Sequence, residues 1–107
     1  MKIKLYQDDL PTSIKLGLSV AIDTETMGLN PLRDKLCLIQ LSSGNGICHL
    51  VRINNLRYKP VNLIKILTNN KILKIFHFAR FDVTILIQIS IFLNIFTITL
   101  SSRLLYL

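Results

Sequence analysis

The stretch "VAIDTETMGL", residues 20–29, decides how the rest of the chain is interpreted. An apolar run from Leu18 to Ile22 is typical of a strand that packs into a core, and it leads into two acids, Asp23 and Glu25. Residues i and i+2 of a strand share one face, roughly 6.5 to 7 Å apart, so the two carboxylates should converge while Thr24 faces away. Adjacent carboxylates repel unless they share a proton, a basic partner or a hard cation, and oxygen ligands suit Mg²⁺ or Mn²⁺ rather than zinc. An ordinary solvated strand end is the alternative interpretation of these acids.

Working outward, the apolar patterns predict alternating strands and helices. Strands are expected over residues 18–25, 35–43, 47–53, 71–78 and 95–100, with a tight turn at "SGNG", 43–46. Helices are expected over residues 61–70, 79–92 and from 101 onward. Three antiparallel strands followed by alternating helix and strand predict an α/β fold, with a mixed sheet that starts with a three-strand antiparallel meander.

Composition and charge limit the classes of protein to consider. The 107 residues fit one small domain, and thirteen Lys and Arg against six Asp and Glu give a formal charge of +7. Such a balance attracts nucleic acid or an anionic membrane, although a basic but otherwise ordinary protein is the alternative. Cys37 and Cys48 lack metal-binding spacing and are expected to be reduced, buried thiols of a cytoplasmic protein. Residues 83–102 carry no charge and are long enough to span a bilayer, but we expect a buried helix followed by a buried strand, and no membrane anchoring.

A second group of polar residues lies in "KIFHFARFD", residues 74–82. Sites in α/β sheets gather where strands end, so Asp82 can face the two acids if this strand lies beside the first. Arg80 is a candidate phosphate contact, Phe78 can stack on a base, and His77 can act as a base or contact phosphate. The structural alternatives are a favourable acid at a helix N-terminus, a solvated Arg, a core Phe and a hydrogen-bonded His.

The stretches "AIDTETMGLNPLRDKLCLIQLSSG" (21–44) and "KIFHFARFDVTIL" (74–86) resemble the first two motifs of the ribonuclease D family, one of the DEDD 3′–5′ exonucleases. The resemblance implies a ribonuclease H-like fold and a hydrolase that releases 5′-mononucleotides from nucleic-acid 3′ ends, a 3′–5′ exoribonuclease. It also implies two divalent ions, Mg²⁺ or Mn²⁺. The catalytic and metal-binding carboxylates implied are Asp23, Glu25 and Asp82. The nucleic-acid-binding residues are Thr26, Met27 and Leu29, which would line the pocket for the 3′-terminal nucleotide, with Phe78 and Arg80.

One departure from the family concerns its third motif, a Tyr or His a few residues before a final Asp. No acid follows Asp82, and only one residue follows Tyr106. We therefore expect residues 1–107 to form a single exonuclease domain truncated before its third motif, with an incomplete metal site and weak or no activity. The expected partners are a single-stranded 3′ end, RNA in preference to DNA, and a separately encoded C-terminal half. Two other hypotheses are a non-catalytic nucleic-acid-binding remnant and a small membrane protein using residues 83–102.

Overall fold

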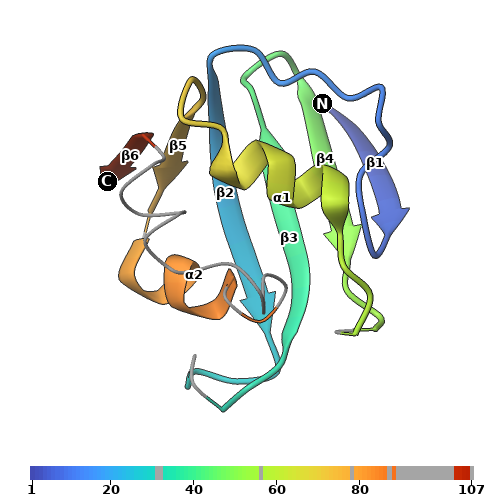
Figure 1. Ribbon diagram of the computed structural model, residues 1–107, viewed down its shortest axis with the longest axis vertical. Helices are drawn as coiled ribbons and strands as arrows, with labels where there is room; N and C mark the ends of the chain where they lie inside the picture. Colours follow the sequence, from blue (N-terminus) through green and yellow to red (C-terminus); the bar gives the residue numbers. More distant parts are fainter. Residues whose placement is uncertain (31–32, 56, 78, 87, 89–102, 107) are drawn as a thin grey trace.

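The computed structural model describes the chain except residues 31–32, 56, 78, 87, 89–102 and 107. The described residues form a six-stranded sheet in the order β1-β4-β3-β2-β5-β6 (Figure 1). The strands are β1 (Lys2–Gln7), β2 (Ser19–Thr26), β3 (Leu36–Ser42), β4 (Ile47–Arg52), β5 (Leu73–Phe76) and β6 (Arg103–Tyr106).

The predicted antiparallel meander is confirmed, because β3 pairs antiparallel with both β2 and β4. Gly44 and Gly46, with φ of 83° and 81°, form the predicted tight turn between β3 and β4 in the left-handed region that glycine tolerates. All other neighbouring strands are parallel. The sheet is therefore mixed, as predicted, and every described strand except β3 ends at the same edge. We call this edge the carboxyl edge.

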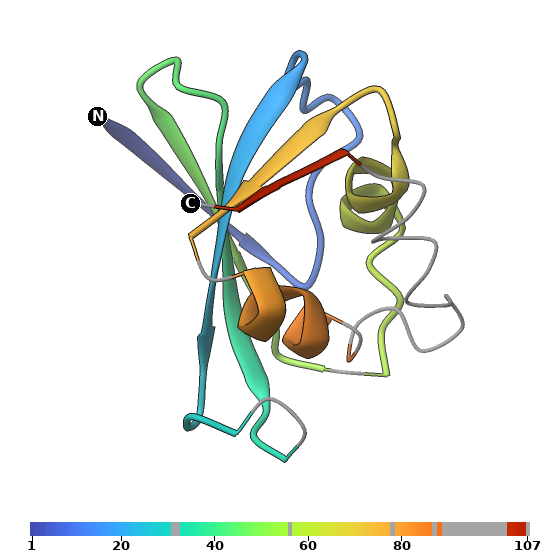
Figure 2. The same ribbon diagram turned by 90° about the vertical axis from the view of Figure 1, so that its left-hand side faces the viewer.

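Two helices, α1 (Val61–Thr68) and α2 (Ala79–Leu86), lie on one side of the sheet (Figure 2). As predicted, α1 follows Pro60, and Asn69 closes it as the C-cap residue. The core between the helices and the sheet includes Val20, Ile22, Ile39, Leu41, Val51, Leu63, Leu67, Phe76, Ile85 and Leu86. Each such side chain contributes roughly 1.5–3 kcal/mol on burial. We call the side of the sheet that faces α1 and α2 the covered face, and the opposite side the open face.

Several sequence expectations need correction. Residues 103–106 form β6 rather than the start of a helix, and this strand supplies partners for the outer backbone groups of β5. Leu18 is 79% exposed, because only alternate residues of the apolar run face the core. Strand β1 was not predicted at all, and it pairs in parallel with β4. The strand expected over 95–100, and the end of the helix expected over 79–92, lie outside the described residues.

Among the described residues, no helix is both long and apolar enough to cross a membrane. Most of the segment 83–102 lies outside those residues.

Candidate active site

Strand β2 separates its polar residues between the two faces of the sheet. Asp23 and Glu25 are exposed, whereas the residues on either side of Asp23, Ile22 and Thr24, are buried. The two acids therefore share the open face, and Thr24 points to the covered face, as the strand period predicted. The residue opposite Asp23 on β3 is Gln40, so the side chain that faces this carboxylate from β3 is uncharged.

The first acid is oriented by the backbone that carries it. One carboxylate oxygen of Asp23, Oδ1, accepts a hydrogen bond of 2.9 Å from the Thr24 N–H. The pairing of β2 with β3 then shifts by a residue between Glu25 and Thr26. Such an irregularity bends a strand and increases its twist, and it is common beside active sites.

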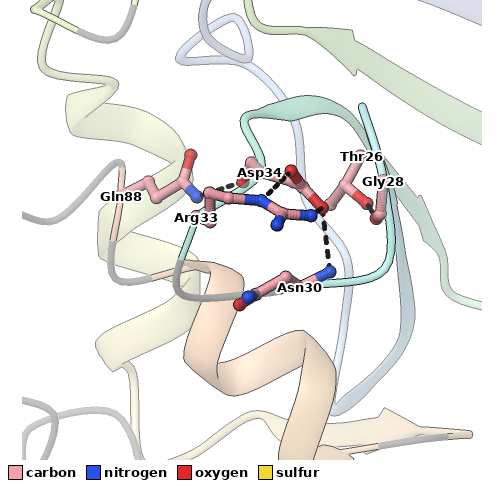
Figure 3. Close-up of polar contacts among 6 residues, drawn as sticks. All are labelled: Thr26, Gly28, Asn30, Arg33, Asp34 and Gln88. Atoms are coloured by element: carbon pink, nitrogen blue, oxygen red, sulfur yellow. Dashed lines mark hydrogen bonds and ion pairs between the residues drawn. The ribbon is translucent and has the colours of Figure 1, made fainter.

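The turn that follows the acids is held by Asp34, as Figure 3 shows. The Asp34 carboxylate accepts hydrogen bonds from the Asn30 N–H at 2.9 Å and from Arg33 Nε at 3.1 Å. The Arg33 guanidinium, with the help of an Asn30 backbone hydrogen bond, holds the pKa of the Asp34 carboxyl below its usual range. Gly28 lies against the same carboxylate, and a Cβ there would collide with it. A larger residue at this position would displace the Asp34 carboxylate that holds the turn.

The same turn presents two apolar side chains to solvent. Met27 is 74% exposed and Leu29 is 92% exposed, directly after the acids. The Met27 N–H donates to the Lys35 carbonyl at 2.9 Å, and the Thr26 hydroxyl donates to the Gly28 carbonyl. A fixed backbone thus carries exposed apolar groups, a combination suited to contact with the ring or sugar of a ligand.

Asp82 lies on the other side of the sheet from the two acids. It is in the first turn of α2, is 3% exposed, and its Oδ1 accepts a 2.5 Å hydrogen bond from the Thr24 hydroxyl. The expectation that Asp82 faces Asp23 and Glu25 is therefore corrected. Because α2 packs on the covered face, the buried Asp82 carboxylate accepts a hydrogen bond from the Thr24 hydroxyl, which points to the same face. No three His, Cys, Asp or Glu side chains of the described residues are grouped to hold a metal ion.

Two predicted nucleic-acid contacts have no described side chain. Phe78 lies outside the described residues, and of Arg80 the structure describes only the backbone, within α2.

A small cavity of about 190 Å³ lies beside Asp23, between β2, β3 and β5. It is lined by Ala21, Ile22, Asp23, Gln40, Ser42, Ile75 and His77. Ligand pockets usually have roughly 300–1,000 Å³, so this cavity can hold only part of a nucleotide. The sequence prediction missed Gln40 and Ser42. The signal that identifies them is the register of the meander, which pairs Asp23 with Gln40 and Ala21 with Ser42.

The donor set of the open face fits a hard divalent cation. Mg²⁺ usually binds through one or two carboxylates, keeps several waters and takes substrate phosphate oxygens as further ligands. Asp23 and Glu25 supply two exposed carboxylates on one face, so they match that requirement without a third protein ligand. A site of this kind binds the cation weakly until phosphate arrives.

Comparison with known proteins assigns the family. The family model for a 3′–5′ exonuclease matches residues 6–107. This chain belongs to the 3′–5′ exonuclease family. The family resemblance inferred from the two sequence motifs is thereby confirmed. A comparison with curated protein sequences found no significant match.

Solved structures of the 3′–5′ exonuclease family share the fold. Brucella melitensis NrnC is 45% identical, with a TM-score of 0.77 over 82% of this chain and 44% of NrnC. Other NrnC structures contain bound Mg²⁺ or pGG. The EXD2 exonuclease domain, soaked in Mn and GMP, is 26% identical, with a TM-score of 0.58 over 84% of this chain and 43% of that domain. Escherichia coli RNase D is 25% identical, with a TM-score of 0.54 over 67% of this chain and 19% of RNase D.

These matches confirm the predicted ribonuclease H-like α/β fold. This chain spans less than half the length of each of these relatives.

Proposed function

We propose that this chain is a metal-dependent 3′–5′ exonuclease that acts on single-stranded RNA and releases nucleoside 5′-monophosphates. The observation that carries the proposal is the pair of exposed carboxylates, Asp23 and Glu25, near the carboxyl edge of the sheet in a member of this family. Structures of NrnC with Mg²⁺ and with pGG, and of EXD2 soaked in Mn and GMP, support a divalent cation and a nucleotide as ligands.

Asp23 and Glu25 would hold the divalent cation. A bound cation of this kind generates a nucleophilic water and stabilises charge on the phosphate and the leaving oxygen. The protein's own contribution is to fix both carboxylates on one rigid strand, with the Thr24 N–H orienting Asp23. By resemblance to the family, we include Asp82 as a third metal-binding carboxylate. By the same resemblance, the complete site would hold two metal ions. The hydrogen bond of Asp82 to Thr24, the residue between the two acids, is an indirect link to them.

The 3′-terminal nucleotide would lie against the turn after the acids. Thr26, Met27 and Leu29 are proposed to contact it, and the exposure of Met27 and Leu29 on a turn fixed by Asp34 supports this role. Phe78 and Arg80 follow β5 in the chain and remain proposed nucleic-acid contacts.

The partner proposed is a single-stranded 3′ end, RNA in preference to DNA. The formal charge of +7 supports this partner. We place the activity in the cytoplasm as part of the same proposal, in keeping with two free cysteine thiols.

A second candidate function is nucleic-acid binding without catalysis. The observation that favours it is the separation of Asp82 from the two exposed acids, which leaves no three-carboxylate group among the described residues. The two candidates differ in turnover, not in binding.

The decisive experiment follows the fate of labelled RNA. Single-stranded RNA carrying a 3′ or a 5′ label, and pGG as a short substrate, are incubated with the purified chain and Mn²⁺. The 3′ label should be released as a mononucleotide, and the 5′-labelled strand should shorten stepwise and slowly. Asp23→Ala controls for contaminating nuclease. Internal cleavage, trimming from the 5′ end, or trimming that persists in Asp23→Ala contradicts the proposal, and RNA binding without any trimming favours the second candidate.

A further inference from the structure

A second cavity, of about 510 Å³, lies at the carboxyl edge next to the turn that follows the acids. It is lined by Met27, Lys35, Leu36, Cys37, Ile53, Asn54, Asn55 and Arg57. We call it the basic cleft. It lies between the start of β3 and the loop that follows β4, and its volume falls in the usual range for small-ligand sites.

The walls of the basic cleft are tied to the sheet. The Met27 N–H donates to the Lys35 carbonyl at 2.9 Å, which joins the end of β2 to the residue before β3. The Ile53 N–H donates to the Cys37 carbonyl at 2.8 Å, which joins the opposite wall to β3. Both walls therefore keep a fixed position relative to the strand that carries the two acids.

The loop that bears Arg57 is also held in place. Oδ1 of Asp8, which lies just beyond β1, accepts hydrogen bonds from the Asn54 N–H at 2.7 Å and the Asn55 N–H at 3.0 Å. The Asn55 side chain in turn accepts a 2.9 Å hydrogen bond from the Arg57 N–H. This Asx turn fixes the backbone that presents the guanidinium, so little backbone entropy is lost when a ligand binds.

The charges of the basic cleft are all of one sign. Lys35 and Arg57 are exposed, and neither has an ion-pair partner in the part of the chain that the structure describes. None of the lining residues is acidic, and the apolar surface between the two cations comes from Met27, Leu36 and Ile53. A cation pair beside apolar surface suits a phosphate with an attached sugar or base, because Arg and Lys bind phosphate oxygens while the apolar part packs below.

We propose that the basic cleft binds the phosphate backbone of the RNA strand upstream of its two 3′-terminal nucleotides, with Lys35 and Arg57 as the phosphate contacts. This inference rests on the proposed exonuclease function and names where the rest of the substrate lies. Met27 supports a continuous binding surface from the acids to the basic cleft, because it lines the cleft and stands two residues after Glu25 in the chain. A strand seated in the cleft therefore lies against the turn that follows the acids.

The test compares two charge-matched double variants of the full chain. Lys35→Gln with Arg57→Gln removes the cleft cations. Lys65→Gln with Lys71→Gln removes two exposed cations near the end of α1 and the start of β5, away from the carboxyl edge. Binding of a labelled eight-nucleotide RNA and of pGG is measured by fluorescence anisotropy at several salt concentrations.

The cleft variant should lose about tenfold in affinity for the eight-nucleotide RNA, and its salt dependence should fall by about 1.4 in slope for two lost phosphate contacts. Its affinity for pGG should change much less, because the cleft serves the upstream strand. Equal losses in the two double variants, or equal losses for pGG and the longer RNA, would overturn the inference.

Cys37 gives a second readout that does not depend on substitution. Its half-buried thiol lines the cleft, whereas the Cys48 thiol is buried. Bound RNA should slow modification of Cys37 by a thiol reagent in the wild-type chain, and an unchanged rate at saturating RNA contradicts the inference. Failure of the proposed function is recognised separately, because it removes trimming while protection of Cys37 persists.

Discussion

The two faces of β2 place carboxylate groups in opposite environments, one buried and one exposed. On the covered face, Thr24 is 8% exposed and binds the carboxylate of Asp82, itself 3% exposed. On the open face, Asp23 and Glu25 are exposed, one residue to either side of Thr24. Burial is costly for a carboxylate and is tolerated only with a partner, and the Thr24 hydroxyl is one such partner for Asp82. The exposed acids remain available as ligands.

This comparison separates stability from function residue by residue. Substitutions on the covered face should change the free energy of unfolding, and substitutions on the open face should change metal binding and turnover.

The largest effect is expected from the exposed acids. Asp23→Asn keeps an oxygen that can accept the Thr24 N–H but removes the charge, and Glu25→Gln removes the second charge. Each should reduce Mn²⁺-dependent trimming by about 10²- to 10⁴-fold, by analogy with loss of one essential catalytic group. Labelled-RNA kinetics measure this loss.

The same variants should leave the free energy of unfolding within about 0.5 kcal/mol of the wild type, since both side chains are exposed. Paramagnetic broadening by Mn²⁺ should centre on residues 23 and 25 and disappear in Asp23→Asn. Broadening spread evenly over the surface would show that the two acids do not form a cation site.

The next largest effect concerns the buried pair. Thr24→Val and Asp82→Ala should each reduce the free energy of unfolding by about 1–3 kcal/mol, because each removes the buried hydrogen bond between these two side chains. The double variant should lose less than the sum of the two, since both remove one interaction. Urea denaturation measures all three.

The variant Asp82→Asn tests whether Asp82 binds the cation in addition to stabilising the fold. If its Mn²⁺ affinity and trimming rate fall while Thr24→Val retains both, Asp82 acts on the cation as well as on the fold. If both variants change stability alone, the role of Asp82 as a metal ligand is ruled out.

Lys74 provides a smaller, pH-dependent test of the covered face. It is 1% exposed, its ammonium donates to the Asn69 carbonyl, and burial lowers its pKa to about 8. Between pH 8 and 10.5 the unfolded chain binds a proton that the folded chain has lost, so stability should rise with pH over this range. Denaturation across this range measures the rise, and Lys74→Met should abolish it; a flat wild-type profile contradicts the prediction.

The smallest effect is expected at His49. Its ring stacks on Tyr6 and its Nδ1 lies 3.1 Å from the Tyr6 hydroxyl oxygen. Burial, and then the charge of Lys4, lower the pKa of His49. Stability should therefore fall as pH drops below 6.5, because the unfolded chain takes up a proton that the folded chain resists. Denaturation at pH 7 and pH 5 tests this, with His49→Gln expected to lessen the fall and His77→Gln, at an exposed position, as the matched control.

Local patterns accounted for most of the fold. The meander, the turn at Gly44 and Gly46, and α1 follow from strand alternation, glycine conformation and helix periodicity, which are all encoded within short windows. Strands β1 and β6 were missed for the opposite reason. Both are edge strands in parallel pairs, and a parallel pairing depends on partners that no short window contains.

The site was predictable to a similar extent. A period of two was enough to put Asp23 and Glu25 on one face. It could not say which face the helices would cover, and that choice decided the surroundings of Asp82. The positions of Gln40 and Ser42 in the site depend on the register between β2 and β3. The basic cleft depends on a loop that Asp8 holds, through a contact between residues far apart in the sequence.

The pairing of β1 with β4 also fixes an order of events during synthesis. Lys2 through Gln7 are made before β2 and β3, but their hydrogen-bonding partners, Ile47 through Arg52, are made only after β2 and β3. Strand β1 must therefore wait for its partner, while β2 and β3 can pair as soon as both exist. Asp8, directly after β1, accepts the hydrogen bonds that hold the loop carrying Arg57. This loop therefore reaches its final structure only after β1 has paired with β4.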